Sequence, residues 1–237
     1  MKASSVILDA LKDIDNTGTL EAEKKMTLYA GKDIRMTADT HREENGQGHT
    51  TAISKRGAAS VTGKESSLTM TAGKDIHLQA ARISSAGDMT IAGKRQVELG
   101  TAVAEKDNRV TWDRSNDRRD STAMETGSTL TAGRNLTVEN GKEITDLEEH
   151  HRHKERSLLS STTTTTHDEV HAVKAQKSII EGNTVSIEGG KDISLTGSAV
   201  ASTKETALSA GRNISIHAAE ETNKEIHKKQ VKKSGLI

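Results

Sequence analysis

Short stretches of alternating apolar and polar residues recur along this chain, and a tight polar turn interrupts each of them. The stretch from Leu130 to Val138 shows the pattern in full, with Leu136 and Val138 on one side after the turn and Thr137 on the other. Period-2 alternation indicates a β-strand, because successive side chains leave a strand on opposite faces. The pattern therefore predicts pairs of short strands joined by turns, with Leu136 and Val138 facing a core.

Each turn consists of a glycine, a cationic residue and then Asp or Asn. Glycine accepts positive φ and close backbone approach, while Asp and Asn tolerate the left-handed region and bond their own backbone. We therefore predict a structural turn role for these residues in five copies of the pattern. They are Gly31 and Asp33, Gly73 and Asp75, Gly133 and Asn135, Gly190 and Asp192, and Gly211 and Asn213. A divergent sixth copy, 89–99, carries one extra residue in its turn.

The spacing of the turn glycines predicts the architecture. Their separations lie close to multiples of about twenty residues, the repeat length of solenoids. A stacked coil must return the chain to the same corner one strand spacing higher, about 4.8 Å. We therefore predict an all-β fold, a right-handed parallel β-helix built as a solenoid of about 20-residue coils. In this register Ile214 and Ile216 occupy the same inward positions as Leu136 and Val138.

Three polar segments interrupt the coils, near residues 39–67, 105–128 and 139–177. We predict that they are extended, hairpin-like excursions of a single β-helical repeat domain covering residues 1–218, and that residues 219–237 form a charged, frayed tail. The excursions differ from one another, and variable insertions on a rigid scaffold commonly carry recognition. The possible contact residues are Trp112, His150, His151, His153, His167 and His171.

Composition narrows the function classes. Of the 237 residues only 32% are hydrophobic and 1% aromatic, which suits a narrow interior filled by small aliphatic side chains. The 34 basic residues balance 34 acidic ones, which argues against a dedicated nucleic-acid binder. The absence of cysteine removes thiol chemistry, and no apolar run is long enough to span a membrane. The first ten residues lack the layout of a signal peptide, so targeting information is expected outside this chain.

Histidine pairs raise the question of a metal site. His167 and His171 are four residues apart, but Asp168 stands where the zinc-protease motif requires Glu, and the preceding threonines disfavour a helix. The cluster of His150, His151 and His153 is interleaved with Glu and Arg, which is typical of an exposed charged segment. We predict no metal ligand and no cofactor.

The recurring carboxylates raise the question of an enzyme. Parallel β-helices also support polysaccharide cleavage, which needs carboxylates that converge on a groove. Asp33, Asp75 and Asp192 recur at one corner, but Asn135 and Asn213 replace them in other copies, and a turn role explains that interchange while catalysis does not. The column of Lys and Arg beside them could attract anionic glycans, or simply offset the acidic column. We predict no catalytic residue, with a polysaccharide-cleaving enzyme as the alternative.

The repeated Ala-Gly-Lys/Arg-Asp/Asn motif at Ala30, Ala72, Ala132 and Ala210 resembles the haemagglutinin repeats of large exported bacterial exoproteins. These are the filamentous haemagglutinins and the contact-dependent growth inhibition toxins, which leave the cell by two-partner secretion. The Ser/Thr run before His167 and the closing 232–236 resemble the second haemagglutinin-repeat block of such toxins.

The resemblance implies a non-catalytic stalk and contact segment that serves cell-surface adhesion and delivery of a C-terminal toxin. The implied partners are an outer-membrane transporter, reached through an N-terminal region absent here, and the surface or outer membrane of a target cell. The implied location is secreted or at the bacterial cell surface, and the implied form is a monomeric rod that binds no nucleic acid. A non-functional remnant of a larger gene is a further interpretation.

Overall fold

The computed structural model describes residues 3–113, 116–140, 143–147, 163–176, 178–218 and 222–232, and every element within them is a β-strand. The predicted all-β class is confirmed. Two of the three sheets are parallel, with ten and seven strands, and a six-stranded third sheet is mixed. The described residues include no helix that is long and apolar enough to cross a membrane.

The ten-stranded sheet, which we call the large parallel sheet, contains two rows of strands. The first row includes β7, β10 and β15, and the second row includes β8, β11 and β16. Longer strands run through both rows. In β3, for example, Thr19–Ala22 pairs with β7 of the first row, and Lys25–Ala30 pairs with β8 of the second row. The bounds are β1 (Ala3–Ala10), β3 (Thr19–Ala30), β7 (Ala58–Val61), β8 (Ser67–Ala72), β10 (Arg82–Ser85), β11 (Asp88–Gly93), β15 (Thr129–Ala132), β16 (Asn135–Asn140), β19 (Ser178–Gly189) and β21 (Ser198–Ala210).

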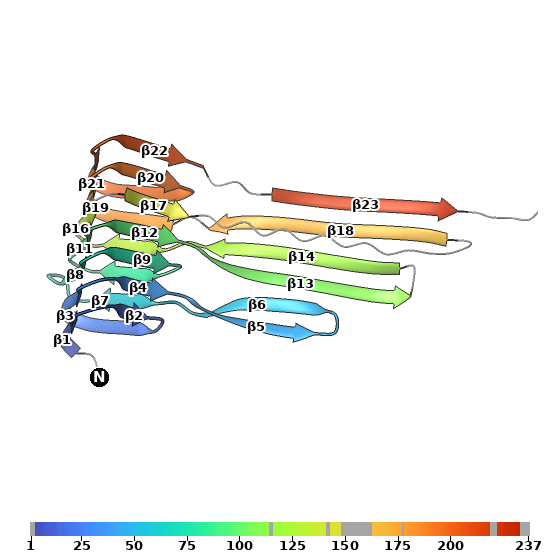
Figure 1. Cartoon of the computed structure of the whole chain (residues 1–237), viewed down its shortest axis with the longest axis horizontal. Coiled ribbons are helices and arrows are strands. Elements are labelled where there is room, and N and C mark those ends of the chain that lie inside the picture. The colour runs from blue at the N-terminus through green and yellow to red at the C-terminus, as the bar shows by residue number, and fades with distance from the viewer. Residues whose placement is uncertain are drawn as a thin grey trace, which may run out of the picture.

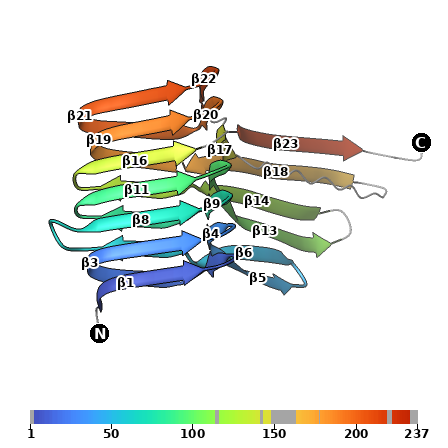
Figure 2. The same cartoon turned by 60° about the vertical axis from the view of Figure 1, so that its left-hand side comes forward.

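The seven-stranded sheet, the small parallel sheet, receives the chain after the second row. Its strands are β2 (Ile14–Asn16), β4 (Ile34–Thr37), β9 (Asp75–Gln79), β12 (Gln96–Gly100), β17 (Glu143–Leu147), β20 (Asp192–Thr196) and β22 (Asn213–His217). The chain runs through β7, β8 and β9, and then repeats the circuit as β10, β11 and β12. We call each such circuit a pass. Figures 1 and 2 show the passes stacked from the N-terminal end at the bottom to β22 at the top.

The apolar positions of successive passes align into columns. Parallel pairing places Met26, Leu68, Met89, Leu136 and Val185 in one such column, and all five side chains are buried. This alignment follows from the alternation in the sequence, because a parallel pair in register keeps the same face inward along the whole sheet. The predicted burial of Leu136 and Val138, with Thr137 on the outer face, is confirmed.

The predicted equivalence of all five turn copies is wrong. The copy that contains Gly133 bends between β15 and β16, the first and second rows, whereas the copies with Gly31, Gly73, Gly190 and Gly211 bend from the second row into the small parallel sheet. Each pass therefore has two corners. The copies at the two corners share one local motif, so the sequence gives no sign of which corner a copy occupies.

The β22 end of the small parallel sheet differs from its middle. Ile193 and Ile214 are register partners on one face, yet Ile193 is fully buried while Ile214 is 45% exposed and Ile216 is 64% exposed. Ile214 and Ile216 therefore share the face of the buried Ile193 and Leu195, but they are not buried there, and β22 belongs to another sheet than the β16 strand of Leu136 and Val138. The reason for their exposure is that β22 is the last strand of its sheet, so no further described strand covers it.

The divergent copy also differs from its predicted form. Gly93 pairs with Ala72, and Gln96 pairs with Asp75. Two residues therefore separate the paired strands in both passes, and the turn has no extra residue. Glycine simply takes the alanine position of the motif there, and Lys94 takes the glycine position.

The polar excursions assemble into one sheet, the lateral sheet. Its strands are β5 (Asp39–Asn45), β6 (Gly48–Lys55), β13 (Ala102–Asp113), β14 (Asn116–Thr126), β18 (Thr163–Gln176) and β23 (Thr222–Lys232). They lie side by side in chain order, with β14 and β18 parallel and the other neighbours antiparallel. Figures 1 and 2 show this sheet extending to one side of the stacked passes.

Parts of the predicted excursions belong to the stack. Residues 58–61 form β7 in the large parallel sheet, and residues 143–147 form β17, which pairs with β12 and β20 in the small parallel sheet. Within the region predicted as a tail, residues 222–232 form β23 and pair with β18. The motif of Gly141, Lys142, Glu143 and Ile144 is a sequence signal that matches the other corners and points to β17.

Candidate contact surface and corner ladder

At the corner glycines, the backbone of one pass lies so close to the backbone of the pass beneath that no side chain fits between them. A Cβ added at Gly31 would lie 2.3 Å from the Leu11 carbonyl oxygen, one at Gly73 2.2 Å from the Gly31 oxygen, and one at Gly211 2.3 Å from the Gly190 oxygen. Gly73 N–H also donates to the Ala30 oxygen at 2.9 Å. Close approach between passes therefore accounts for glycine here, and none of these glycines has a positive φ.

The corner carboxylates bond the next pass rather than their own turn. Asp33 N–H donates to Asp13 Oδ1 at 3.1 Å, Asp75 N–H to Asp33 Oδ1 at 3.2 Å, and Asn213 N–H to Asp192 Oδ1 at 3.2 Å. These bonds form a ladder from pass to pass, the corner ladder. The residue that donates can be either asparagine or aspartate, because it donates through its backbone N–H to the carboxylate of the pass beneath.

Arginine side chains bond the carboxylates of the corner ladder. Arg95 Nε donates to Asp75 Oδ1 at 2.7 Å, and its Nη2 also pairs with Oδ2. Arg35 Nη2 donates to Asp33 Oδ2 at 2.6 Å, and Arg212 bonds Asp192. The hydrogen bond from Arg95 lowers the pKa of Asp75 although burial opposes it, and the bond from Arg212 lowers the pKa of Asp192. Charge-assisted bonds of this kind are stronger than neutral ones.

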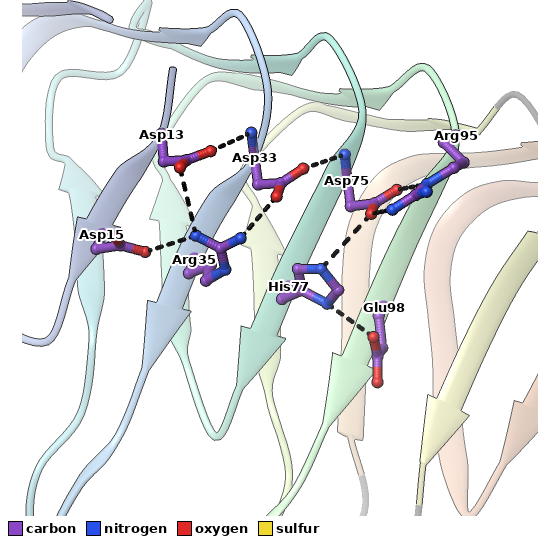
Figure 3. Close-up of polar contacts among 8 residues, drawn as sticks. All are labelled: Asp13, Asp15, Asp33, Arg35, Asp75, His77, Arg95 and Glu98. Carbon is purple, nitrogen blue, oxygen red and sulfur yellow. Dashed lines mark hydrogen bonds and ion pairs between the residues drawn. The ribbon is translucent and has the colours of Figure 1, made fainter.

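His77 joins the ladder to a neighbouring acid. Its Nδ1 lies 2.7 Å from Glu98 Oε2, and its Nε2 lies 3.8 Å from Asp75 Oδ2 (Figure 3). His77 was not among the residues predicted from the sequence, although it sits two residues after a turn aspartate as Arg35 does. No group of three or more potential metal ligands occurs among the described residues.

The corner carboxylates accept hydrogen bonds from backbone N–H groups and from arginine side chains. Asp75 is only 3% exposed and accepts from Arg95. At the other corner, Asp88 Oδ1 accepts from Asn135 N–H at 3.2 Å, and Asp88 Oδ2 accepts from Arg134 at 2.7 Å. These carboxylates hold neighbouring passes together, which is the structural role that the interchange of Asp and Asn indicates.

The corner cations divide into two sets. The side chains of the arginines at the turns bond carboxylates. Lys32 and Lys74 instead form hydrogen bonds through their backbone N–H groups, and their side chains are exposed. Lys32 N–H donates to the Lys12 oxygen at 2.8 Å, and Lys74 N–H donates to the Lys32 oxygen at 2.8 Å. The exposed lysine column therefore runs up the stack, one strand spacing per pass.

The lateral sheet brings together the predicted contact residues that the structure describes. Trp112 lies on β13, and His167 and His171 lie on β18, with β14 between them. The two histidines are on a strand and not on a helix, as the preceding run of threonines predicts. The predicted residues His150, His151 and His153 lie outside the described residues.

Two described hairpins meet in this sheet through specific contacts. β6 pairs with β13 from Gly48 to Thr51, and a Cβ at Gly48 would lie 2.0 Å from the Asp107 oxygen. His49 Nε2 lies 3.6 Å from Glu105 Oε2 across the same pair. The first two excursions therefore dock directly on each other.

A partly buried polar junction anchors the lateral sheet to the stack. The Arg56 guanidinium follows β6 and donates to the Ala80 oxygen at 2.5 Å and to the Gly127 oxygen, just after β14, at 2.7 Å. Ser128 is fully buried and donates to the Leu78 oxygen at 2.6 Å. Burial, and secondarily the charge of Arg82, lowers the pKa of Arg56. The junction was not predicted from the sequence, because its bonds run to backbone carbonyls, which leave no side-chain motif.

Comparisons with known proteins agree with the predicted resemblance. The hemagglutinin repeat family model matches residues 159–236. The protein named tRNA nuclease CdiA of Escherichia coli (strain STEC_O31) is 26% identical over 271 residues, covering 98% of this chain and 8% of that protein. The 16S rRNA endonuclease CdiA of Enterobacter cloacae subsp. cloacae is 33% identical over 113 residues, 46% of this chain and 3% of the relative. The tRNA nuclease CdiA-2 of Burkholderia pseudomallei (strain 1026b) is 26% identical over 81% of this chain and 7% of the relative.

The chain thus spans less than a tenth of the length of these relatives. No solved structure matches it. The CdiA relatives support the predicted location, which is secreted or at the bacterial cell surface. The family match and the relatives together show that the chain is similar to the haemagglutinin-repeat regions of the exoproteins of contact-dependent growth inhibition.

Proposed function

We propose that residues 1–218 form one right-handed parallel β-helix domain, a non-catalytic stalk and contact segment of a large exported exoprotein. The support is the repeated circuit through two rows and the small parallel sheet, with parallel pairing and aligned apolar columns. Crossovers between parallel strands are right-handed in nearly all proteins. A stack of this kind gains most of its stability from contacts between neighbouring passes, which suits a long rod.

The observation that carries the contact role is the lateral sheet. Six strands, from the three excursions and from the region predicted as a tail, leave the stack on one side and pair with one another (Figure 1). Such a sheet presents a broad polar surface on a rigid scaffold, where recognition usually occurs. The partner would be the surface or outer membrane of a target cell, and an outer-membrane transporter would export the parent protein through regions outside this chain.

The corner ladder favours a stalk over the alternative of a polysaccharide-cleaving enzyme. Glycoside hydrolysis needs a pair of carboxylates that flank one bond, with one of them protonated at working pH. The carboxylates of Asp33, Asp75 and Asp192 accept from the next pass and from arginine, and those of Asp75 and Asp192 have lowered pKa values. A lowered pKa opposes the role of a general acid.

The relatives named as nucleases suggest what the stalk would deliver. The matched part of these proteins covers less than a tenth of their length, so their nuclease activity is proposed to lie outside the region that this chain represents. The chain would then serve adhesion to a target cell and delivery of a C-terminal toxin. The parent protein would act as a monomeric rod.

The proposal can be tested with a chimera of the E. coli CdiA relative in which this chain replaces the matched segment. A second chimera replaces residues 104–124, the outer part of the β13–β14 hairpin, with a short turn. We expect both to reach the cell surface, and only the first to bind target cells and inhibit their growth in co-culture. Equal inhibition by the two would place recognition outside this hairpin. Release of reducing ends from polysaccharide by the isolated chain would favour the enzyme instead.

A further inference from the structure

The turn that joins β5 and β6 contains an Asn-Gly step, at the outer end of the hairpin that forms one edge of the lateral sheet (Figure 1). Asn45 and Gly46 are both exposed. We propose that Asn45 is a site of spontaneous deamidation, which places an aspartyl or isoaspartyl residue at this tip. The modification depends only on local geometry and does not rest on the proposed stalk function.

The side chain of Asn45 is folded back over the next peptide. Gln47 N–H donates to Asn45 Oδ1 at 2.9 Å, which closes a local side-chain turn. This turn holds the Asn45 Cγ near the backbone nitrogen of Gly46, the atom that must attack it. The side chain is therefore placed close to the reacting geometry before any motion of the backbone.

The backbone of Gly46 is free to complete the approach. No hydrogen bond holds its N–H in the part of the chain that the structure describes, and a Cβ at this position would meet nothing within 4 Å. Glycine also has the widest range of backbone conformations. Solvent can therefore remove the amide proton, and the peptide can rotate toward Cγ without displacing a neighbour.

The reaction is balanced by water alone. Solvent base takes the Gly46 N–H proton, the nitrogen forms a bond to Asn45 Cγ, and the Cγ–Nδ2 bond breaks with release of ammonia. A five-membered succinimide ring results. Water then adds to one of the two ring carbonyls, giving an aspartyl residue or, at the other carbonyl, an isoaspartyl linkage.

Three asparagines in the part of the chain that the structure describes are less well placed for this reaction. The N–H after Asn108 belongs to Arg109 and donates to the Gln47 oxygen at 2.5 Å, and the N–H after Asn183 donates to the Arg134 oxygen at 3.3 Å. Asn16 accepts from the Gly18 N–H at 3.1 Å in the same kind of turn as Asn45, but its side-chain Nδ2 also donates to the Gly18 oxygen at 3.0 Å and to the Ala58 oxygen at 3.3 Å, which fixes the amide in a partly buried position. These three positions serve as internal controls within the same molecule.

Deamidation would change both charge and geometry at the tip. A new carboxylate would lie beside Glu44, which already pairs with Arg42 at 2.6 Å. An isoaspartyl linkage adds a methylene to the backbone where Asn45 pairs with Gly48, and Gly48 packs on Asp107 with no room for a Cβ. We therefore expect the isoaspartyl form to weaken the pairing of β6 with β13, while the stacked passes stay intact.

The test is incubation of the full chain at mildly alkaline pH, followed by peptide mass spectrometry that detects a gain of about 1 Da at each asparagine. We expect the gain at Asn45 to run well ahead of the three internal controls. Gly46→Ala should slow it about tenfold, because a Cβ restricts the approach of the peptide nitrogen. Asn45→Gln should abolish the gain at this position. Hydrogen exchange of residues 48–51 should quicken as the isoaspartyl form accumulates.

Two results would overturn the proposal. One is a rate at Asn45 no higher than that of Asn108 or Asn183 in the folded chain. The other is an unchanged rate in Gly46→Ala, which would show that the freedom of the Gly46 peptide does not control the reaction. Gly46 lies in an open turn, so this variant is expected to fold.

Discussion

Gly73 offers the sharpest test of the stacked architecture. It lies at a corner in the middle of the stack, and the change Gly73→Ala would place a Cβ 2.2 Å from the Gly31 oxygen and 2.9 Å from the Gly31 carbonyl carbon. Ordinary contacts begin near 3.4 Å, so the two passes must separate by about 1 Å at this corner. The neighbouring bonds from Gly73 N–H to Ala30 at 2.9 Å and from Lys74 N–H to Lys32 at 2.8 Å would stretch with them.

The magnitude follows from these two effects. Overpacking costs about 1–3 kcal/mol, and weakening one or two backbone hydrogen bonds adds about 0.5–1.5 kcal/mol each. We therefore expect Gly73→Ala to lower the free energy of unfolding by about 2–5 kcal/mol in urea titrations followed by circular dichroism. Gly46→Ala is the matched control, since its Cβ meets nothing within 4 Å. A Gly73→Ala variant as stable as that control would refute the close approach of passes at this corner.

Three further changes probe the stack, the ladder and the junction. Ile193→Ala should cost about 2–5 kcal/mol, while Ile214→Ala on the same column should cost much less, because only Ile193 is fully buried; equal costs in thermal unfolding would contradict the exposed end. Because Arg95 lowers the folded-state pKa of Asp75, this carboxylate stabilises the fold above the unfolded pKa, and the contribution is lost as pH falls through the folded value. Stability of Asp75→Asn should therefore depend less on acidic pH than that of the wild type, and parallel pH profiles would argue against the ladder. Arg56→Met should cost about 1.5–3 kcal/mol and speed hydrogen exchange at the base of the lateral sheet before that of the core; uniform exchange changes would show that the junction is not a separate anchor.

The candidate site was only partly predictable from the sequence. The recurrence of Gly, Lys or Arg, and Asp or Asn in the sequence falls at the corners of the passes. The cause differs from the prediction, because Asp33 bonds the amide of Asp75 in the next pass and not its own turn. The contacts of His77 and Arg56 could not be predicted, because their hydrogen-bond partners are distant in sequence. A pattern read within one copy cannot show a bond between copies.

The strands and their inward faces could be predicted from the amino-acid pattern, because period-2 alternation is a local property of an extended chain. The same is true of the twenty-residue periodicity, since each pass must bring similar apolar side chains over those below. The corner that each copy occupies could not be predicted. Gly133 and Gly73 lie at different corners, but both lie close to the backbone of the pass beneath. A Cβ added at either glycine would lie 2.2 Å from a carbonyl oxygen of that pass. The same sequence motif therefore fits both corners.

The pairing of the excursions with one another is a property of the folded chain. Their strands carry mixed charge without a repeating apolar face, so nothing local specifies a partner for β6 or β14. Stacking of the passes brings the bases of successive excursions close together on one side, and their free backbone groups then pair in chain order. The exposure of Ile214 has the same origin, because burial depends on the neighbouring pass and not on the residue itself.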